Sequence, residues 1–190
     1  HIYMALREIL TEPNKLLREK SLTVEKVDED LQKLMDDMLE TMYAAPGIGL
    51  AAIQVGVPKR VIVLDIGLQN KSENTNGEKQ EVRKNPMYFV NPEIITKSAN
   101  NSIYEEGCLS VPGQFAEIER PNKCNIKYLD YYGQSKELVA EGMLATCIQH
   151  EMDHLEGILF IDYLSKLKKS MIVKKLLKQK EKEQIDRIVI

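Results

Sequence analysis

The chain has 190 residues, 43% of them hydrophobic and 29% charged, and its formal net charge is −3. Such a length most simply makes one domain with its own core, and the composition is typical of soluble globular proteins. No apolar run approaches the about 20 residues of a membrane-spanning helix, so the sequence excludes membrane insertion.

The N-terminus is expected to carry no secretory signal. The N-terminal segment is charged throughout and lacks the apolar stretch of a secretory signal. Residues 1–3 precede Met4 and are expected to be an expression remnant, which leaves 4–190 as a single domain. Residues 166–190 are strongly basic and the remainder is acidic, so specific DNA binding is not expected.

Three widely spaced cysteines argue against disulfides and for a reducing, cytoplasmic compartment.

The hydrophobic pattern predicts helices at both ends of the chain and strands between them. Residues 28–45 place apolar side chains at three-and-four spacing, typical of a helix with one buried face. Short β-branched or aromatic runs predict strands at 60–66, 87–95, 115–120 and 123–133, and a polar stretch predicts an exposed loop at 68–85. Further helices are predicted at 142–155 and 165–183. The predicted strands and helices do not alternate regularly along the chain, which favours an α+β fold over a doubly wound one. In this fold antiparallel sheets would pack around a central helix, with an N-terminal and a C-terminal helix.

The central helix is predicted to carry the motif QHEMDHLEG at residues 149–157. His150 and His154 are separated on a helix by about 40° of rotation and about 6 Å of rise, so both rings can converge on one ion. Glu151 lies about 100° round from His150, where it can reach water bound to that ion. The competing interpretation is an ordinary polar stripe, because a pair of histidines at this spacing is common by chance. The HExxH form favours a metal.

A catalytic metal site of this kind needs a third ligand. The metzincin form requires a histidine at position 160, and the chain has Phe160 there, so that family is excluded. Glu181 and Glu183 could serve as in thermolysin-like enzymes, but in the basic tail they have the pattern of solvated helix charges.

The three cysteines are the remaining candidates. Cys147 shares the histidine face but lies about 10.5 Å along the helix from His154, too far for one ion, and is predicted to line the cavity wall. Cys124 alternates with apolar residues in a strand and is interpreted as a buried core thiol. Cys108 lies in EEGCLSVPG, where Gly107 allows a close backbone approach, and is predicted to present a thiolate from a loop. The alternative for Cys108 is a small buried apolar residue.

A glycine-rich stretch, PGIGLAAIQVGV, spans residues 46–57. Gly47, Gly49 and Ala52 formally match a dinucleotide-binding fingerprint, which requires a strand before it and a helix after it. The predicted order is the reverse, so the cofactor interpretation is excluded. The bare backbone is predicted to lie against a ligand, with the Gln54 amide as a donor toward the same place.

Taken together, GIGLAAIQ, EEGCLS and QHEMDHLEG resemble the three signature motifs of peptide deformylase in the expected order, and the similarity runs over residues 4–180. The resemblance implies a catalytic domain that removes the formyl group from N-formylmethionyl nascent polypeptides and releases formate, by metal-hydroxide attack. It implies one divalent ion per chain, held by Cys108, His150 and His154, with Glu151 as acid and base. Ferrous iron is the family's usual ion, and zinc, nickel or cobalt also suit these ligands.

The resemblance also implies the residues that contact the substrate. The oxyanion is expected to be held by Gln54 and the backbone amide of Leu109. The expected substrate-binding residues, which include the methionine pocket, are Gly47, Ile48, Gly49, Tyr104, Glu106, Gly107, Met143 and Cys147. Nascent chains as substrates imply a bacterial cytoplasmic enzyme.

Three alternatives stay open from the residues alone. One is an HExxH endopeptidase that cleaves internal peptide bonds, against which the Cys108 segment argues. Another is a metal-binding module without activity, against which Glu151 and Gln54 argue, because neither is needed for coordination. For the basic tail, a solvated helix that packs through Ile172, Val173, Leu176 and Leu177 is favoured over electrostatic docking on the ribosome.

Overall fold

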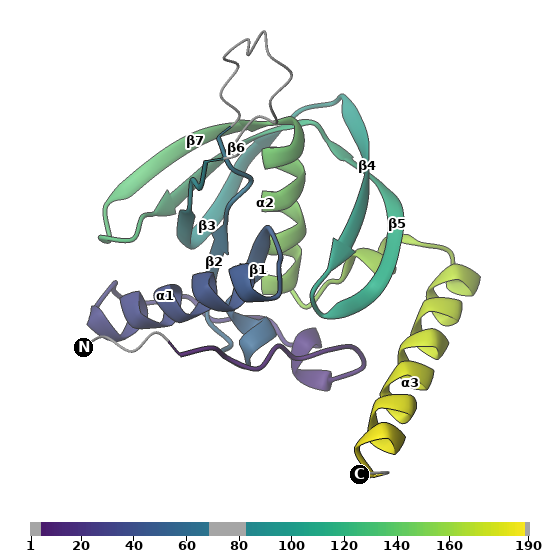
Figure 1. Ribbon diagram of the computed structural model, residues 1–190. Coiled ribbons are helices and arrows are strands. Elements are labelled where there is room, and N and C mark those ends of the chain that lie inside the picture. Colours follow the sequence, from purple (N-terminus) through teal and green to yellow (C-terminus); the bar gives the residue numbers. More distant parts are fainter. Residues whose placement is uncertain (1–4, 69–82, 189–190) are drawn as a thin grey trace, which may run out of the picture.

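The computed structural model describes residues 5–68 and 83–188 (Figure 1). Most of the predicted exposed loop at 68–85 therefore lies outside the described residues. The helices are α1 (Glu29–Ala44), α2 (Gly142–Leu155) and α3 (Lys166–Ile188), with short 3-10 turns at η1 (Lys15–Arg18), η2 (Ala52–Val55) and η3 (Phe160–Tyr163). The strands are β1 (Gly49–Ala51), β2 (Val61–Leu64), β3 (Met87–Lys97), β4 (Asn101–Cys108), β5 (Val111–Pro121), β6 (Lys123–Leu129) and β7 (Ser135–Glu141).

All neighbouring strands pair antiparallel, in a five-stranded sheet of order β1-β2-β3-β6-β7 and in a separate β4-β5 hairpin. The predicted α+β class with antiparallel sheets and three helices is confirmed. In Figure 1, α2 lies between the five-stranded sheet and the β4-β5 hairpin. Within the described ranges, no helix is both long and apolar enough to cross a membrane.

The sheet is covered on both faces, which explains why β2 is apolar at every position. Val61 and Val63 pack in the core cluster formed with α1, whereas Ile62 and Leu64 pack in the cluster formed with α2. Alternate residues of a strand point to opposite faces, so a strand covered on both sides reads as an unbroken apolar run.

Three strands were not predicted from the sequence: β1, β4 and β7. β1 has only three residues, and β7 is largely exposed, with its sequence SKELVAE giving little apolar alternation. The prediction that Cys108 lies in a loop is wrong in detail, because Cys108 is the last residue of β4 and pairs with Val111. A register shift between Gly107 and Cys108 closes the hairpin through a tight turn, and a bulge of this kind re-aims the side chain at the strand end.

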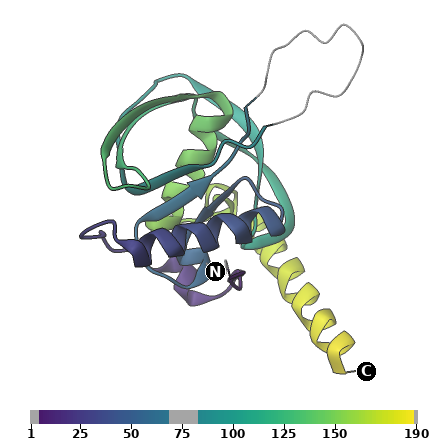
Figure 2. The same cartoon turned by 60° about the vertical axis from the view of Figure 1, so that its left-hand side comes forward.

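The C-terminal helix α3 projects from the body of the protein in both views (Figure 2). Leu176 is buried, and Ile172 and Val173 pack against the same cluster as predicted. Leu177 does not pack there, and 43% of it is exposed. A helix turns about 100° per residue, so Leu177 lies to the side of the face that buries Leu176.

Asp37 ties the N-terminal segment to α1. Its side chain is 2% exposed, accepts a hydrogen bond from the backbone N–H of Ala5 and pairs with Arg7 at 3.0 Å. Burial alone would raise the pKa of Asp37, but the Ala5 N–H, Arg7 and Lys33 outweigh it and lower the pKa. A lowered folded-state pKa means that the carboxylate stabilises the fold above the unfolded pKa of about 3.9 and that this contribution disappears as the pH falls through the folded value.

Replacing Asp37 with Asn is therefore expected to lower the free energy of unfolding by about 1–2 kcal/mol at pH 7. The difference from the unsubstituted protein should shrink as the pH is lowered through 4 toward the folded pKa, which urea unfolding at several pH values measures. Glu40→Gln, at an exposed position of the same helix, should have little effect. A difference that stayed constant with pH would contradict the assigned role of the charge.

Candidate metal centre

The structure brings together the three residues predicted to hold a metal. α2 supplies His150 and His154, and the end of β4 supplies Cys108. One ligand atom of each residue lies within 4.8 Å of the others, and the Cys108 Sγ lies 3.3 Å from the His154 Nε2. Tetrahedral ligands at about 2.0–2.3 Å from an ion lie about 3.5 Å from one another, so this donor set fits a small divalent cation.

The ring of His150 is oriented for such a role. Its Nδ1 lies 2.8 Å from the Glu106 Oε1, which leaves the Nε2 directed toward the cluster. Metal-binding histidines usually make this kind of bond with the ring nitrogen that does not bind the ion. The corresponding Nδ1 of His154 is buried and has no hydrogen-bond partner among the described residues. Burial is the main cause that lowers the pKa of His154, and this favours the neutral ring that a metal requires.

Glu106 is itself held by a buried ion pair with Arg120. The Arg120 Nε and Nη2 donate to the two Glu106 carboxylate oxygens at 2.7 and 3.0 Å, and the Arg120 Nη1 donates to Asp153 at 2.8 Å. The Arg120 guanidinium therefore bridges the carboxylates of Glu106 and Asp153. Burial would raise the pKa of Glu106, but His150 and Arg120 lower it, so this side chain is a carboxylate at neutral pH.

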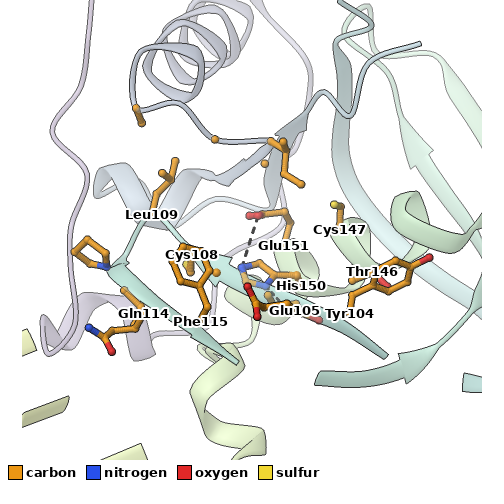
Figure 3. Close-up of a pocket in the computed structure, with 18 of the residues that line it drawn as sticks. Tyr104, Glu105, Cys108, Leu109, Gln114, Phe115, Thr146, Cys147, His150 and Glu151 are labelled. Atoms are coloured by element: carbon orange, nitrogen blue, oxygen red, sulfur yellow. Dashed lines mark hydrogen bonds and ion pairs between the residues drawn. The ribbon is translucent and has the colours of Figure 1, made fainter. Parts of the chain in front are cut away.

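Glu151 lies beside the ligand cluster, with its Oε1 3.9 Å from the His150 Nε2 (Figure 3). Its carboxylate is 5% exposed, and the Oε2 has no hydrogen-bond partner among the residues that the structure describes. Burial is the main cause that raises the pKa of Glu151 to about 7, and the negative charge of Glu106 adds to it. A carboxyl group with a pKa near neutral pH can both accept and return a proton.

Gly49 of β1 passes directly against this carboxylate. A Cβ built on Gly49 would lie 2.7 Å from the Glu151 Oε1, closer than van der Waals contact permits. The absence of a side chain at this position therefore fixes how near the β1 backbone comes to Glu151. The sequence indicated a close backbone approach in this stretch, but the partner was not predicted.

Gly49→Ala is expected to displace the Glu151 carboxylate and to lower kcat/KM at least about tenfold, because small misplacements of a reacting group are costly. Metal content and the thermal unfolding midpoint should change little, since the atom nearest the added methyl group is the far end of the flexible Glu151 side chain. The measurement is steady-state turnover, with metal analysis on the same samples. An unchanged kcat/KM would show that the close approach has no role in turnover.

A pocket of about 590 Å³ opens onto the cluster. It is lined by all of the residues predicted to bind substrate: Gly47, Ile48, Gly49, Tyr104, Glu106, Gly107, Met143 and Cys147. Cys108, Leu109, His150 and Glu151 also line it. The sequence did not indicate Phe115, Thr146 or Ile9, which line the pocket as well. Phe115 is 64% exposed, but its exposure is a result of the tertiary structure, and the sequence showed only an aromatic residue at the start of the predicted strand at 115–120.

Gln54 differs in detail from the expectation, whereas Cys147 lies in the pocket wall as expected. Gln54 is 1% exposed and is absent from the pocket lining among the described residues. Its side-chain amide donates to the Ser110 Oγ at 3.0 Å and to the Cys108 Sγ at 3.5 Å, so it lies beside the cluster as expected while its role toward an oxyanion stays a prediction. Burial and the nearby Glu151 raise the pKa of Cys147 to about 12, so this thiol is neutral in the pocket wall.

The model of one protein family, described as polypeptide deformylase, matches residues 6–170. The chain belongs to the peptide deformylase family. A peptide deformylase of Pelagibacter ubique is 65% identical over 177 residues, which cover 93% of this chain and 96% of that protein. The crystal structure of the peptide deformylase of Ehrlichia chaffeensis is 44% identical, with a TM-score of 0.83, and the match covers 93% of this chain and 97% of that one.

A more distant peptide deformylase has been solved with a short peptide. The class I type b peptide deformylase of Acinetobacter baumannii, bound to Met-Ala-Ser, is 34% identical with a TM-score of 0.74. The match covers 85% of this chain and 100% of that one. Membership of this family also disfavours the HExxH endopeptidase that the motif alone left open.

Proposed function

We propose that this protein is a metal-dependent hydrolase that removes the N-terminal formyl group from formylmethionyl peptides and releases formate. The observation that carries the proposal is the meeting of Cys108, His150 and His154, of which Cys108 and His150 line an open pocket together with Glu151. Two imidazoles and one thiolate leave one of four tetrahedral positions for solvent or substrate, as catalytic sites require.

The three side chains would hold one divalent ion, with Fe²⁺ as the native ion and Zn²⁺, Ni²⁺ or Co²⁺ able to occupy the same ligands. When bound, the ion supplies Lewis acidity to the formyl oxygen and lowers the pKa of water. The ion pair of Glu106 with Arg120 keeps the His150 ring in position through the Nδ1 contact.

In this proposal Glu151 moves the proton. Its carboxylate takes a proton from the attacking water and returns it to the departing nitrogen, which frees formate and the methionine amino group. Burial of the Glu151 carboxylate favours its protonated form, which suits a group that must donate a proton as well as accept one. The Leu109 backbone N–H and the Gln54 amide would donate hydrogen bonds to the oxygen that gains negative charge.

The peptide would lie along β1 with its methionine side chain in the pocket. The backbone from Gly47 to Gly49 offers extended polar groups, and Tyr104, Met143 and Cys147 give an apolar wall. The neutral Cys147 thiol suits contact with a thioether. That a family member has been solved with Met-Ala-Ser supports a peptide that begins with methionine.

One assay tests this proposal against its rivals. Protein loaded anaerobically with Fe²⁺ is given formyl-Met-Ala-Ser and an unformylated peptide, and formate and cleavage products are measured. We expect formate from the first peptide and no internal cleavage of either. Cleavage without formate would instead indicate an endopeptidase, and bound metal without turnover would indicate a binding module.

We further propose that residues 4–190 work as a single catalytic domain in the cytoplasm, where nascent chains are made. The basic helix α3 would then serve to bring the enzyme to the ribosome by attraction to RNA phosphates. Several of its lysines are exposed, among them Lys168, Lys174, Lys175 and Lys178. The part of α3 that packs on the body, around Leu176, has to be retained in a fair test.

Reversal of the charge of Lys174, Lys175 and Lys178 to Glu is expected to weaken ribosome co-sedimentation at least about tenfold at low salt, because phosphate contacts dominate such binding. Activity on formyl-Met-Ala-Ser should be unchanged, since these residues lie outside the pocket lining. Equal, salt-independent ribosome binding by the variant would rule out the electrostatic role.

A further inference from the structure

A second cavity, of about 510 Å³, lies where the turn between β6 and β7 meets α1. The Gln32 side chain of α1 donates to the Tyr131 carbonyl oxygen at 3.0 Å and ties the two elements together. The cavity is lined by Asp36, Pro86, Met87, Tyr88, Tyr128, Asp130, Tyr131 and Tyr132. Tyrosines and aspartates dominate this lining, and among the described residues no lysine or arginine belongs to it.

The rings of Tyr88, Tyr131 and Tyr132 contact one another in sequence at this cavity. The ring centroids of Tyr88 and Tyr131 are 4.9 Å apart, and those of Tyr131 and Tyr132 are 5.1 Å apart with the planes at 80°. Tyr132 is 75% exposed, so the outer end of this row of rings is open to solvent. Burial and the charge of Asp36 raise the pKa of Tyr131 to about 12, so the ring stays neutral with an electron-rich face.

Two other tyrosine–aspartate pairs in this protein each have a cation over the tyrosine ring. In two places, a tyrosine hydroxyl donates to an aspartate and a cation lies over the tyrosine ring: Tyr43 with Asp65 and Lys84, and Tyr163 with Asp153 and Arg120. The Lys84 Nζ lies 4.4 Å from the ring centroid of Tyr43. The Arg120 Cζ lies 5.0 Å from the ring centroid of Tyr163.

The cavity contains a third pair of this kind. The Tyr131 hydroxyl donates to the Asp36 Oδ2 at 3.2 Å. Within residues 5–68 and 83–188, no lysine or arginine forms an ion pair with Asp36 or lies over the Tyr131 ring. The Tyr131–Asp36 pair thus has the carboxylate and the aromatic ring of the other two pairs, but among the described residues it has no cation. The cavity is open to solvent beside Tyr132.

We propose that this cavity binds the guanidinium group of an arginine side chain presented by another polypeptide. A guanidinium is planar, stacks on aromatic faces and donates from a fork that matches a carboxylate, and it is less strongly hydrated than an ammonium. Tyr88, Tyr131 and Tyr132 supply the faces, and Asp36 supplies the carboxylate. The acidic character of the chain outside α3 adds a long-range attraction for a basic segment.

Nuclear magnetic resonance on the full chain tests this proposal, with labelled tyrosine and with Zn²⁺ bound. The probe is acetyl-Gly-Arg-Gly-amide, and the matched neutral probe has citrulline in place of arginine. We expect saturable shifts of the Tyr88, Tyr131 and Tyr132 ring signals with the arginine peptide alone. Asp36→Asn and Tyr132→Ala should each weaken binding at least about fivefold, as loss of a cation–π or charge contact implies.

The control is Glu40→Gln, an exposed carboxylate one turn along the same helix and outside the cavity lining. Its affinity for the arginine peptide should stay within about twofold of the unsubstituted protein, because exposed charges contribute little. Absence of saturable shifts, equal binding of the citrulline peptide, or unchanged affinity in both cavity variants would overturn the proposal. Equal affinity for a lysine peptide would overturn the assignment of guanidinium.

Discussion

Glu151→Gln is expected to lower kcat for formyl-Met-Ala-Ser by about 10²–10⁴-fold, the usual contribution of a general acid and base. Glutamine keeps the shape of the side chain but cannot accept a proton. Glu151 is no member of the three-residue ligand cluster, so metal content should be unchanged. Steady-state kinetics and metal analysis on one preparation separate the two effects.

The matched comparison is Glu105→Gln, an exposed glutamate of the pocket lining that is not one of the three residues of the ligand cluster. Its kcat should fall by no more than about twofold, because an exposed charge at the pocket rim is screened by solvent. Turnover that persisted in Glu151→Gln would mean that another group transfers the proton. Loss of metal from Glu151→Gln would instead assign the residue a role in holding the ion.

Cys108→Ala is expected to remove the bound metal and with it the activity. The variant keeps two histidines, and two neutral ligands bind divalent ions far more weakly than a set that includes a thiolate. We expect metal per chain to fall well below one after dialysis and kcat/KM to fall by at least about 10³-fold, since the Lewis acid is lost. Folding should be retained, because Cys108 is only partly buried at the end of β4.

The other two cysteines are the controls for this loss. Cys124→Ala removes a buried thiol from the core and should lower the free energy of unfolding by about 1 kcal/mol while metal content is kept. Cys147→Ala enlarges the pocket wall and should raise KM more than it lowers kcat. Full metal content in Cys108→Ala would contradict the assignment of this thiolate as a ligand.

The sequence by itself determined the parts of the site that depend on local geometry. The spacing of His150 and His154 puts both rings on one helix face whatever the rest of the fold does. The predicted helix at 142–155 coincides with α2, because an apolar face repeats at the helical period. The choice of Cys108 as the third residue came from exclusion of the alternatives, and its signature motif pointed the same way. The structure brings it to the cluster.

Only the tertiary structure decided which distant groups meet. Glu106 and Arg120 bond across the β4-β5 hairpin, and Gly49 meets Glu151 from a strand about a hundred residues away in the chain. The tyrosine and aspartate cavity likewise joins α1, β3 and the β6-β7 turn. Periodicity fixes the face on which a side chain lies, whereas the partner of that face depends on which elements pack together. That packing is set by the burial of apolar surface over the whole chain.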